Sequence, residues 1–255
     1  MGQLQYASKL QRGEYTAKLY RRPRRDSQLA YAGMDDPYSG KSWGRVMEQG
    51  AVLDGYSELL DKWKLGAHLG LFALAGDGVA DNSGADLYLG LQRQIYAGSN
   101  TVFEAGPYLY ATAYRKNLNH FTLGHGGYFS PQRLLQPGVS GLWQYQSTDL
   151  IYRFRAGIGY QSQHDDEIAR YPLQDDGTLW AAGDNNGITG NVKFTWVKQL
   201  GQSPWQWSGL LSAEEGPEHG QRDAWLLLRY NFNGRSEARF EDLPEQMMPT
   251  LPVVP

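Results

Sequence analysis

The sequence of 255 residues contains no cysteine, which excludes disulfide bridges, thiol catalysis and cysteine-ligated metal sites. It contains no run approaching the roughly 18 apolar residues that a membrane-spanning helix needs. The first ten residues also lack the apolar centre of a signal peptide. Basic residues are not in excess, since 24 lysines and arginines stand against 27 aspartates and glutamates. A net charge of −3 therefore gives no indication of nucleic-acid binding.

Glycine and aromatic residues are abundant in a chain that is polar on average. There are 31 glycines, 17 tyrosines and 8 tryptophans, and the mean hydropathy is −0.56. This combination is typical of outer-membrane β-barrels, because every second residue of each strand faces a wet lumen while the others face lipid.

Apolar and polar residues alternate with a period of two along most of the chain, and helical periodicity is nearly absent. In residues 151–161, for example, Tyr152, Phe154 and Ile158 share one face, opposite arginine and glycine. The same alternation occurs in residues 63–74, 86–95, 188–196 and 223–232. Alternation alone fits two folds, since the apolar face points inward in a soluble β-sandwich and outward in a membrane barrel.

The connections between these segments favour the membrane barrel. Long connections are expected at residues 35–46, 75–83, 115–136, 162–186 and 214–221. They alternate with short turns near residues 22–25, 59–62, 97–100, 147–150 and 199–203. Short periplasmic turns and long outer loops are typical of up-and-down outer-membrane barrels, whereas a Greek-key sandwich does not segregate its loops.

We therefore predict an all-β fold, a transmembrane antiparallel up-and-down β-barrel with about 12 strands in this chain. The barrel is expected to occupy residues 1–232. Its weakest strands are expected at residues 3–10, 14–21 and 27–33. Residues 233–255 carry four prolines and are predicted to be an extended C-terminal tail on the periplasmic side.

A glycine-rich connection with large apolar side chains lies near the middle of the chain. Its glycines and Pro131 exclude a helix interior and a central strand, yet it carries more apolar surface than a free loop. We expect it to fold over or into the mouth of the barrel as a gate loop. The expected gate-loop residues are Gly124, His125, Gly126, Gly127, Tyr128, Phe129, Ser130, Pro131 and Gln132.

Three separated motifs resemble those of a known family, in the same order. They are RRPRRDSQLAYAGMDDPYSGKSWGRV at residues 21–46, GDGVADN at residues 76–82 and NHFTLGHGGYFSPQ at residues 119–132. The ending LLLRYNFNG, with DLPEQ and a proline-rich tail, is similar too. Together they resemble the C-terminal outer-membrane barrel of the bacterial cellulose synthase operon protein C family, over essentially the whole chain.

The resemblance implies a non-enzymatic, porin-like channel of the bacterial outer membrane. It would export nascent cellulose, a β-1,4-glucan, from the periplasm to the cell surface during biofilm exopolysaccharide production. In that family a sixteen-stranded barrel follows periplasmic tetratricopeptide repeats, so this chain would begin near the fifth strand as a fragment, or else form a complete smaller barrel. The implied partners are the glucan, outer-membrane lipid, the repeats of the same full-length protein and the inner-membrane cellulose synthase complex. No cofactor or metal is implied.

A neutral sugar chain needs hydroxyl partners and flat apolar surfaces along a wet path. The polar residues expected on the inward face are Arg153, Arg155, Lys193, Arg229, Gln144, Gln146, Asn191 and Asn231. The aromatic platforms expected there are Tyr88, Phe72 and Trp225. Arg153 and Arg155 have an alternative role, which is to pair with inward carboxylates such as Asp86 or Asp223.

Two other functional classes fit some residue types. His120, His125 and Ser130 could belong to a Ser-His hydrolase, which would make the chain an outer-membrane barrel enzyme of the lipase or acyltransferase type. A soluble polysaccharide-binding β-sandwich is the third class. It predicts that the chain folds without detergent.

Three polar clusters are better explained as solvated segments. Asp77, Asp81 and Asp86 do not have the spacing of an EF-hand calcium loop. His164 and the acidic residues 165–167 are expected at a loop tip. The four arginines of residues 21–25 are expected in a basic periplasmic turn that contacts acidic lipid head groups, a periplasmic partner or solvent.

Overall fold

The computed structural model describes residues 2–60, 62–174, 176–217, 220–232 and 234–244. Its main element is one 12-stranded antiparallel sheet in which the long strands are neighbours in chain order. These strands are β1 (Gly2–Leu10), β2 (Gly13–Pro23), β4 (Ser42–Leu60), β5 (Trp63–Asp77), β6 (Val79–Ala97), β7 (Thr101–Tyr114), β8 (Arg133–Gln146), β9 (Leu150–Asp165), β12 (Gly183–Gln199), β13 (Trp205–Glu215) and β14 (Gly220–Tyr230). The predicted all-β, antiparallel, up-and-down order is confirmed.

Three shorter strands complete the β structure. The short β3 (Met34–Asp35) pairs with the start of β4. Strands β10 (Ile168–Ala169) and β11 (Leu179–Trp180) form a separate two-stranded sheet. Among the described residues, no helix has the length and apolar character to cross a membrane.

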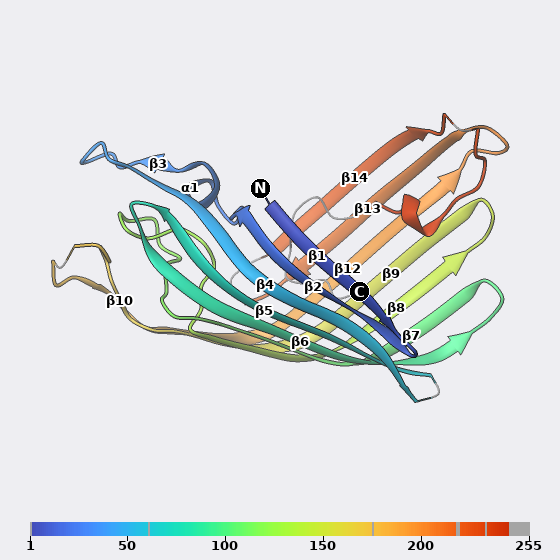
Figure 1. Cartoon of the computed structure of the whole chain (residues 1–255), viewed down its shortest axis with the longest axis horizontal. Coiled ribbons are helices and arrows are strands. Elements are labelled where there is room, and N and C mark those ends of the chain that lie inside the picture. The colour runs from blue at the N-terminus through green and yellow to red at the C-terminus, as the bar shows by residue number, and fades with distance from the viewer. Residues whose placement is uncertain (1, 61, 175, 218–219, 233, 245–255) are drawn as a thin grey trace.

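The large sheet curls into a trough whose strands are strongly tilted (Figure 1). Strands β1 and β14 are its two edges, and no pairing joins them in the part of the chain that the structure describes. Inward side chains of the long strands from β4 to β14 all point to the concave face of the trough.

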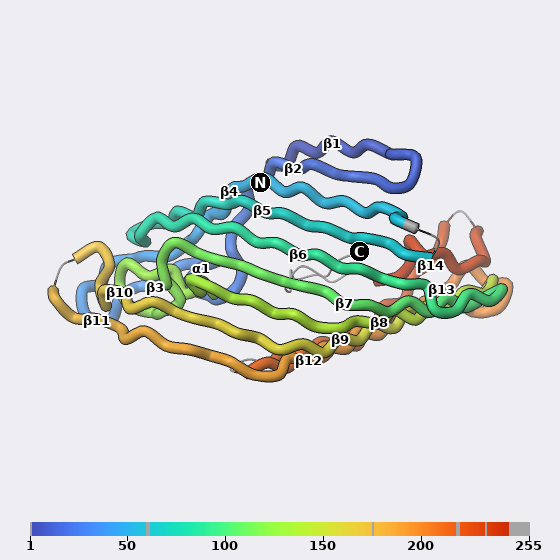
Figure 2. Tube along the Cα trace, turned by 90° about the horizontal axis from the view of Figure 1, so that it is seen from below, coloured from blue at the N-terminus to red at the C-terminus, as the bar shows by residue number. Residues whose placement is uncertain are grey.

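The two ends of the sheet differ in the length of their connections. At one end, which we call the loop end, long connections span residues 24–41, 115–132 and 166–182. At the opposite end, which we call the turn end, the strands are joined by turns such as residues 98–100 and 147–149. In Figures 1 and 2 the loop end carries α1, β3 and the β10–β11 pair, so the predicted segregation of loops is present.

The connection at residues 24–41 differs from the expectation of a strand at residues 27–33. The Ser27 hydroxyl accepts a hydrogen bond from the Ala30 amide at 3.0 Å and caps a short helix, α1 (Gln28–Ala32). Strand β2 continues to Pro23, so the arginine-rich segment opens this long connection at the loop end. The prediction of a short periplasmic turn at residues 22–25 is therefore wrong.

The long connection expected at residues 75–83 is also absent. Strands β5 and β6 continue to Asp77 and Val79 and close on Gly78 alone. Gly78 has a positive φ of 60°, which glycine adopts without a steric penalty from a side chain. Strands β5 and β6 therefore form a tight hairpin in place of the predicted long connection.

The apolar side chains of the alternation lie exposed on the convex face. Leu71 is 56% exposed and Leu226 is 68% exposed, and Leu69, Leu89 and Phe154 are exposed as well. Polar side chains occupy the concave face instead. This arrangement is the reverse of a soluble sandwich, in which the apolar faces of two sheets are buried against each other.

The tail differs from the expected extended segment where it is described. Residues 235–243 turn back onto the concave face at the turn end and include a 3-10 helix, η1 (Phe240–Asp242). This fold depends on contacts with side chains of the sheet, which proline content does not reveal. Residues 233 and 245–255 lie outside the described part of the chain.

Candidate functional site

A polar cavity of about 690 Å³ lies on the concave face of the sheet. Residues from β4 through β14 line it, which places it in the hollow of the trough. Several residues predicted for a lumen do line this cavity: Tyr88, Gln144, Arg153, Arg155, Asn191 and Lys193. The two-residue periodicity therefore identified the correct face of these strands.

The other predicted lumen residues lie outside the cavity wall. Phe72 is buried at the loop end, where its ring centroid is 5.0 Å from that of Tyr114. Arg229 donates a hydrogen bond to Asp242 at 2.8 Å. Trp225 lies on the edge strand β14 and is partly exposed. Gln146 and Asn231 do not contribute to the wall either.

A stacked tyrosine pair forms a flat aromatic surface in the cavity. The rings of Tyr88 and Tyr108 have centroids 5.9 Å apart and an interplanar angle of 10°. The Gln136 amide donates to the Tyr108 hydroxyl at 3.0 Å, so this surface is bordered by hydrogen-bonding groups. Sequence reasoning missed Tyr108 and Tyr110, although both occupy the inward phase of the alternation in β7.

Several charged side chains on the concave face are compensated by partners on other strands. His68 lies between Asp54 and Asp86, with each nitrogen–oxygen distance 2.6 Å. Lys64 pairs with Glu104 at 2.7 Å. The carboxylates of Asp54, Asp86 and Glu104 are therefore already paired.

Arg153 and Arg155 are exceptions to this pairing. Asp86 is held by His68, and Asp223 accepts hydrogen bonds from Ser212 and Gln221 at 3.1 and 3.0 Å. Among the described residues, neither guanidinium lies within 4.0 Å of a carboxylate, so the expected pairing is not found. The Arg153 guanidinium instead lies 5.5 Å from the centre of the Phe240 ring.

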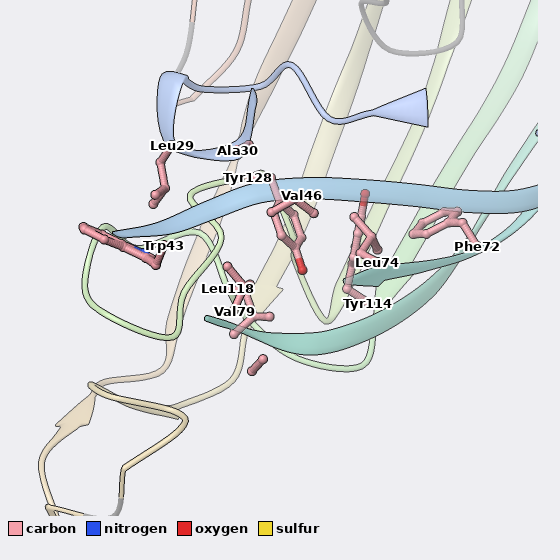
Figure 3. Packing of buried hydrophobic residues seen from close by; sticks show 11 residues of the cluster. Leu29, Ala30, Trp43, Val46, Phe72, Leu74, Val79, Tyr114, Leu118 and Tyr128 are labelled. Atoms are coloured by element: carbon pink, nitrogen blue, oxygen red, sulfur yellow. The ribbon is translucent and has the colours of Figure 1, made fainter. Parts of the chain in front are cut away.

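At the loop end the gate loop packs onto the concave face and fills it with apolar side chains (Figure 3). We call this cluster the loop-end seal. Its members are Leu29, Ala30, Trp43, Val46, Phe72, Leu74, Val79, Ala80, Tyr114, Leu118 and Tyr128. Leu29 and Ala30 come from α1, Leu118 and Tyr128 come from the connection between β7 and β8, and the others come from strands β4 to β7. The seal lies at the loop end of the concave face, beyond the polar cavity.

Two gate-loop glycines have backbone conformations that other residues avoid. Gly124 has a φ of 96° and its carbonyl accepts a hydrogen bond from the Ala80 amide at 2.8 Å. A Cβ atom at Gly124 would lie 2.9 Å from Pro172. Gly127 has a φ of 62° and packs close to Leu29. The glycines therefore allow the loop to fit against β6, α1 and the connection between β9 and β12.

His125 and Ser130 are both fully buried, and each is bonded to the backbone. The Ser130 hydroxyl accepts from the Leu118 amide at 2.8 Å and donates to the Tyr128 carbonyl at 3.1 Å. The His125 Nε2 lies 3.1 Å from the Ala169 carbonyl oxygen. These contacts shape the loop, and they leave no Ser-His pair in the described residues.

The remaining gate-loop residues join the same packed unit. The Phe129 amide donates to Asp26 at 3.2 Å, and the Gln132 side chain accepts from the Asp166 amide at 2.8 Å. The Gly126 amide donates to the Leu118 carbonyl, and the Pro131 carbonyl accepts from the Tyr114 amide. These residues therefore belong to one packed connection between β7 and β8.

The polar clusters set aside in the sequence have ordinary partners. His164 contacts Asp184 at 2.7 Å and Asp166 at 3.2 Å. Asp77 pairs with Arg45 at 3.6 Å. Arg22 and Arg24 converge on the carboxylate of Glu48 at 2.8 and 2.6 Å. The described part of the chain contains no group of three or more His, Asp or Glu residues that could hold a metal ion.

The buried imidazole of His125 lies in the same loop as Tyr128 of the loop-end seal, so we expect the closure of this loop to be sensitive to acid. Burial lowers the pKa of His125 to about 4, below its ordinary value of 6.5. The groups facing it are the Ala169 carbonyl, the Arg170 backbone and the ring of His120, at 5.1 Å between centroids. The closed loop keeps His125 neutral, while an open loop lets it protonate below pH 6.5. The seal therefore loses stability as the pH falls from about 6.5 towards 4.

We expect the amides of residues 118–132 to exchange hydrogen faster at pH 5 than at pH 7, after correction for intrinsic rates. A pKa that moves from about 6.5 to about 4 destabilises the closed loop by about 2 kcal/mol at pH 5, or roughly 30-fold in opening. His125→Gln should show a much smaller acid response. His164→Gln, at a histidine outside the seal, should keep the full response. Equal responses in His125→Gln and the unmodified protein would contradict this prediction.

Comparison with known proteins places this cavity and seal in a family context. The family described as cellulose synthase operon protein C C-terminus matches residues 1–233. Cellulose synthase operon protein C of Pseudomonas fluorescens is 30% identical over 244 residues, which are 94% of this chain and 18% of that protein. The protein of the same name from Xanthomonas axonopodis pv. citri is 34% identical over 152 residues, 59% of this chain and 10% of that protein. The Escherichia coli K12 protein is 29% identical over 178 residues, 68% of this chain and 15% of that protein. The chain thus spans 10–18% of the length of these relatives.

Proposed function

Since this chain belongs to the family of the C-terminal region of cellulose synthase operon protein C, we propose that it forms the wall of an outer-membrane channel that exports nascent cellulose. The names of its relatives support a role in cellulose synthesis. In this proposal the protein catalyses no reaction, and the concave face guides the β-1,4-glucan from the periplasm to the cell surface.

The observation that carries the proposal is the distribution of polar and apolar side chains. Exposed leucines cover the convex face, and a cavity lined by polar side chains occupies the concave face. A lipid bilayer stabilises exposed apolar side chains, and a water-filled lumen stabilises the polar ones. Each inner strand of the sheet pairs with a neighbour on both sides, as lipid requires, whereas the edge strands β1 and β14 each have one neighbour and need a further pairing partner in this proposal.

The cavity has the chemistry that a neutral glucan needs. The stacked pair of Tyr88 and Tyr108 offers a flat surface for the C–H faces of pyranose rings. Gln136, Ser140 and Asn191 line the same cavity and supply donors and acceptors for sugar hydroxyls. Weak contacts of both kinds along the wall hold a moving chain without trapping it.

The gate loop closes the loop end in this proposal, and the loop end faces the outside of the cell. The seal buries Tyr128 and Leu118 against Val46, Phe72 and Leu74, on the face that the glucan follows. The glucan, or a change in the membrane, would have to displace this loop. The further partners in the proposal are outer-membrane lipid, periplasmic tetratricopeptide repeats of the full-length protein and the inner-membrane cellulose synthase complex.

Conductance measurements test the gated channel. The complete gene product, reconstituted in planar lipid bilayers, is expected to conduct poorly. A variant in which residues 117–131 are replaced by a Gly-Ser linker of equal length should conduct ions stably. If this gate-replaced variant keeps its β-sheet circular dichroism but does not conduct, a channel closed by the gate loop alone is excluded.

Cellulose secretion tests the cargo in the cell. Deleting the gene in a cellulose-producing host should remove cellulose from the cell surface while synthesis in membrane extracts continues. The unmodified gene should restore surface cellulose. Normal surface cellulose in the deletion strain would exclude the proposed export function.

Arg153 and Arg155 should control which small ions pass through the cavity. The Coulomb energy between one arginine charge and a passing monovalent ion is about 0.6 kcal/mol at about 7 Å in bulk water. Replacing both arginines with glutamine in the gate-replaced variant should therefore shift the permeability ratio towards cations by at least about fivefold at low salt. The reversal potential in a potassium chloride gradient measures this shift.

The matched control removes two arginines that do not line the cavity. Arg12 lies in the turn between β1 and β2, and Arg133 lies at the start of β8, and both are exposed. Arg12→Gln with Arg133→Gln should leave the reversal potential nearly unchanged. An equal shift in both double variants would show that Arg153 and Arg155 have no special place on the ion path.

A further inference from the structure

The C-terminal segment 235–243 lies across the concave face at the turn end. The Ala238 amide donates to the Thr148 carbonyl at 3.0 Å, and the Gln206 side chain donates to the Glu237 carbonyl at 2.9 Å. Thr148 belongs to the turn between β8 and β9, and Gln206 lies on β13. The segment therefore bridges the turn-end parts of strands that form one wall of the trough, as its place in Figure 2 also shows.

One buried carboxylate holds this segment in place. Asp242 is 3% exposed and accepts hydrogen bonds from Arg229 at 2.8 Å and Arg235 at 2.6 Å. It also accepts from the Arg239 amide at 2.9 Å. Arg229 belongs to β14, so this carboxylate joins the segment to the sheet by a charge-assisted hydrogen bond.

The apolar contacts of the segment are few. Ala238 and Leu243 pack on Ile151 and Val197, which lie on the inward face of β9 and β12. Phe240 covers Arg153, a residue of the cavity wall, at 5.5 Å. The segment therefore borders the cavity while burying a much smaller apolar cluster than the loop-end seal does.

We propose that residues 235–243 are a latch that closes the turn end of the glucan path and is released when the glucan enters. This inference rests on the proposed export function. With the latch docked, Phe240 occupies the face of Arg153 that a glucan passing that wall would contact. Docking and glucan occupancy therefore exclude each other, and each lowers the population of the other. Gly234, with a φ of 72°, lies directly before the latch, where the chain can pivot.

A reversible crosslink tests whether the latch must move. The natural sequence has no cysteine, and Thr148 and Ala238 are joined by a backbone hydrogen bond. Thr148→Cys and Ala238→Cys are introduced together into the gate-replaced variant of the complete gene product. Oxidation should reduce the conductance at least tenfold, and a reducing agent should restore it. The gate-replaced parent, oxidised in parallel, controls for other thiols.

Releasing the latch should have the opposite effect. Asp242→Asn removes the charge that holds Arg229 and Arg235, so the gate-replaced variant should conduct more with this substitution. Glu241→Gln is the matched control, because Glu241 is an exposed carboxylate next to Asp242 in η1, and it pairs with Arg235 at 3.3 Å. It should leave the conductance unchanged.

The outcomes separate this inference from the proposed function. If the gate-replaced variant conducts, but the crosslinked form conducts equally well after verified oxidation, the latch is a fixed part of the wall and the inference fails alone. If the gate-replaced variant does not conduct, either by itself or with Asp242→Asn added, the channel itself is excluded. Conductance that falls on oxidation and returns on reduction supports the latch.

Discussion

Tyr128→Ala is expected to open the loop-end seal. Tyr128 is 1% exposed, its ring lies 6.3 Å from that of Tyr114, and its hydroxyl accepts from Asn82 at 3.2 Å. Removing a buried aromatic side chain costs about 3–5 kcal/mol, because the lost contacts leave a cavity. The closed loop should therefore lose at least about a hundredfold in relative population. Conductance of the complete protein should rise, and amides of residues 117–131 should lose hydrogen-exchange protection.

Two controls identify the cause of this opening. Tyr128→Phe keeps the ring and loses one hydrogen bond, so its effect should be about 1 kcal/mol. Phe121→Ala removes a ring of similar size that is exposed in the same loop, and it should change conductance little. If Phe121→Ala opened the channel as much as Tyr128→Ala, the packing of the seal would not be the cause.

Glu48→Gln is expected to destabilise the whole sheet near the loop end. Glu48 is 1% exposed and accepts from Tyr20 at 2.7 Å, Arg22 at 2.8 Å and Arg24 at 2.6 Å. Losing one partner of a buried ion pair costs about 3–5 kcal/mol, because the remaining charge is left uncompensated. We expect about 3 kcal/mol, the lower value, since Arg22 is half exposed and Asp26 still pairs with Arg24.

Unfolding in urea from lipid vesicles measures this loss. The matched control is Glu58→Gln, at an exposed glutamate on the same strand β4. It should change the free energy of unfolding by less than about 0.5 kcal/mol. Equal losses in the two variants would mean that the pairing of Glu48 with its arginines contributes nothing specific.

The alternation of residues predicted the faces of the strands because it depends on local geometry alone. In an extended chain, successive side chains point to opposite sides whatever the neighbouring strands are. Arg153, Arg155 and Lys193 were therefore placed correctly on the face that carries the cavity. The packing of residues 124–132 follows the expectation for a similar reason, since glycine and proline next to large apolar side chains favour a packed connection.

Pairings between strands could not be predicted, because they depend on register. Asp86 was an expected partner for the arginines, but register places it opposite Gly70, where it reaches His68 on β5. The helix α1 was missed because it has five residues and depends on the Ser27 cap and the burial of Leu29. The folded tail was missed because the pairing of Asp242 with Arg229 leaves no periodic signal in the sequence.

If the proposed latch operates, the cavity has two barriers in series, the apolar loop-end seal at one end and the ionic latch at the other. If each barrier stands open about 1% of the time and the two open independently, both are open together only about one time in 10,000. An idle channel would then leak far less than either barrier alone permits. A polymer that holds one barrier open while its own bulk fills the passage would preserve that protection during secretion.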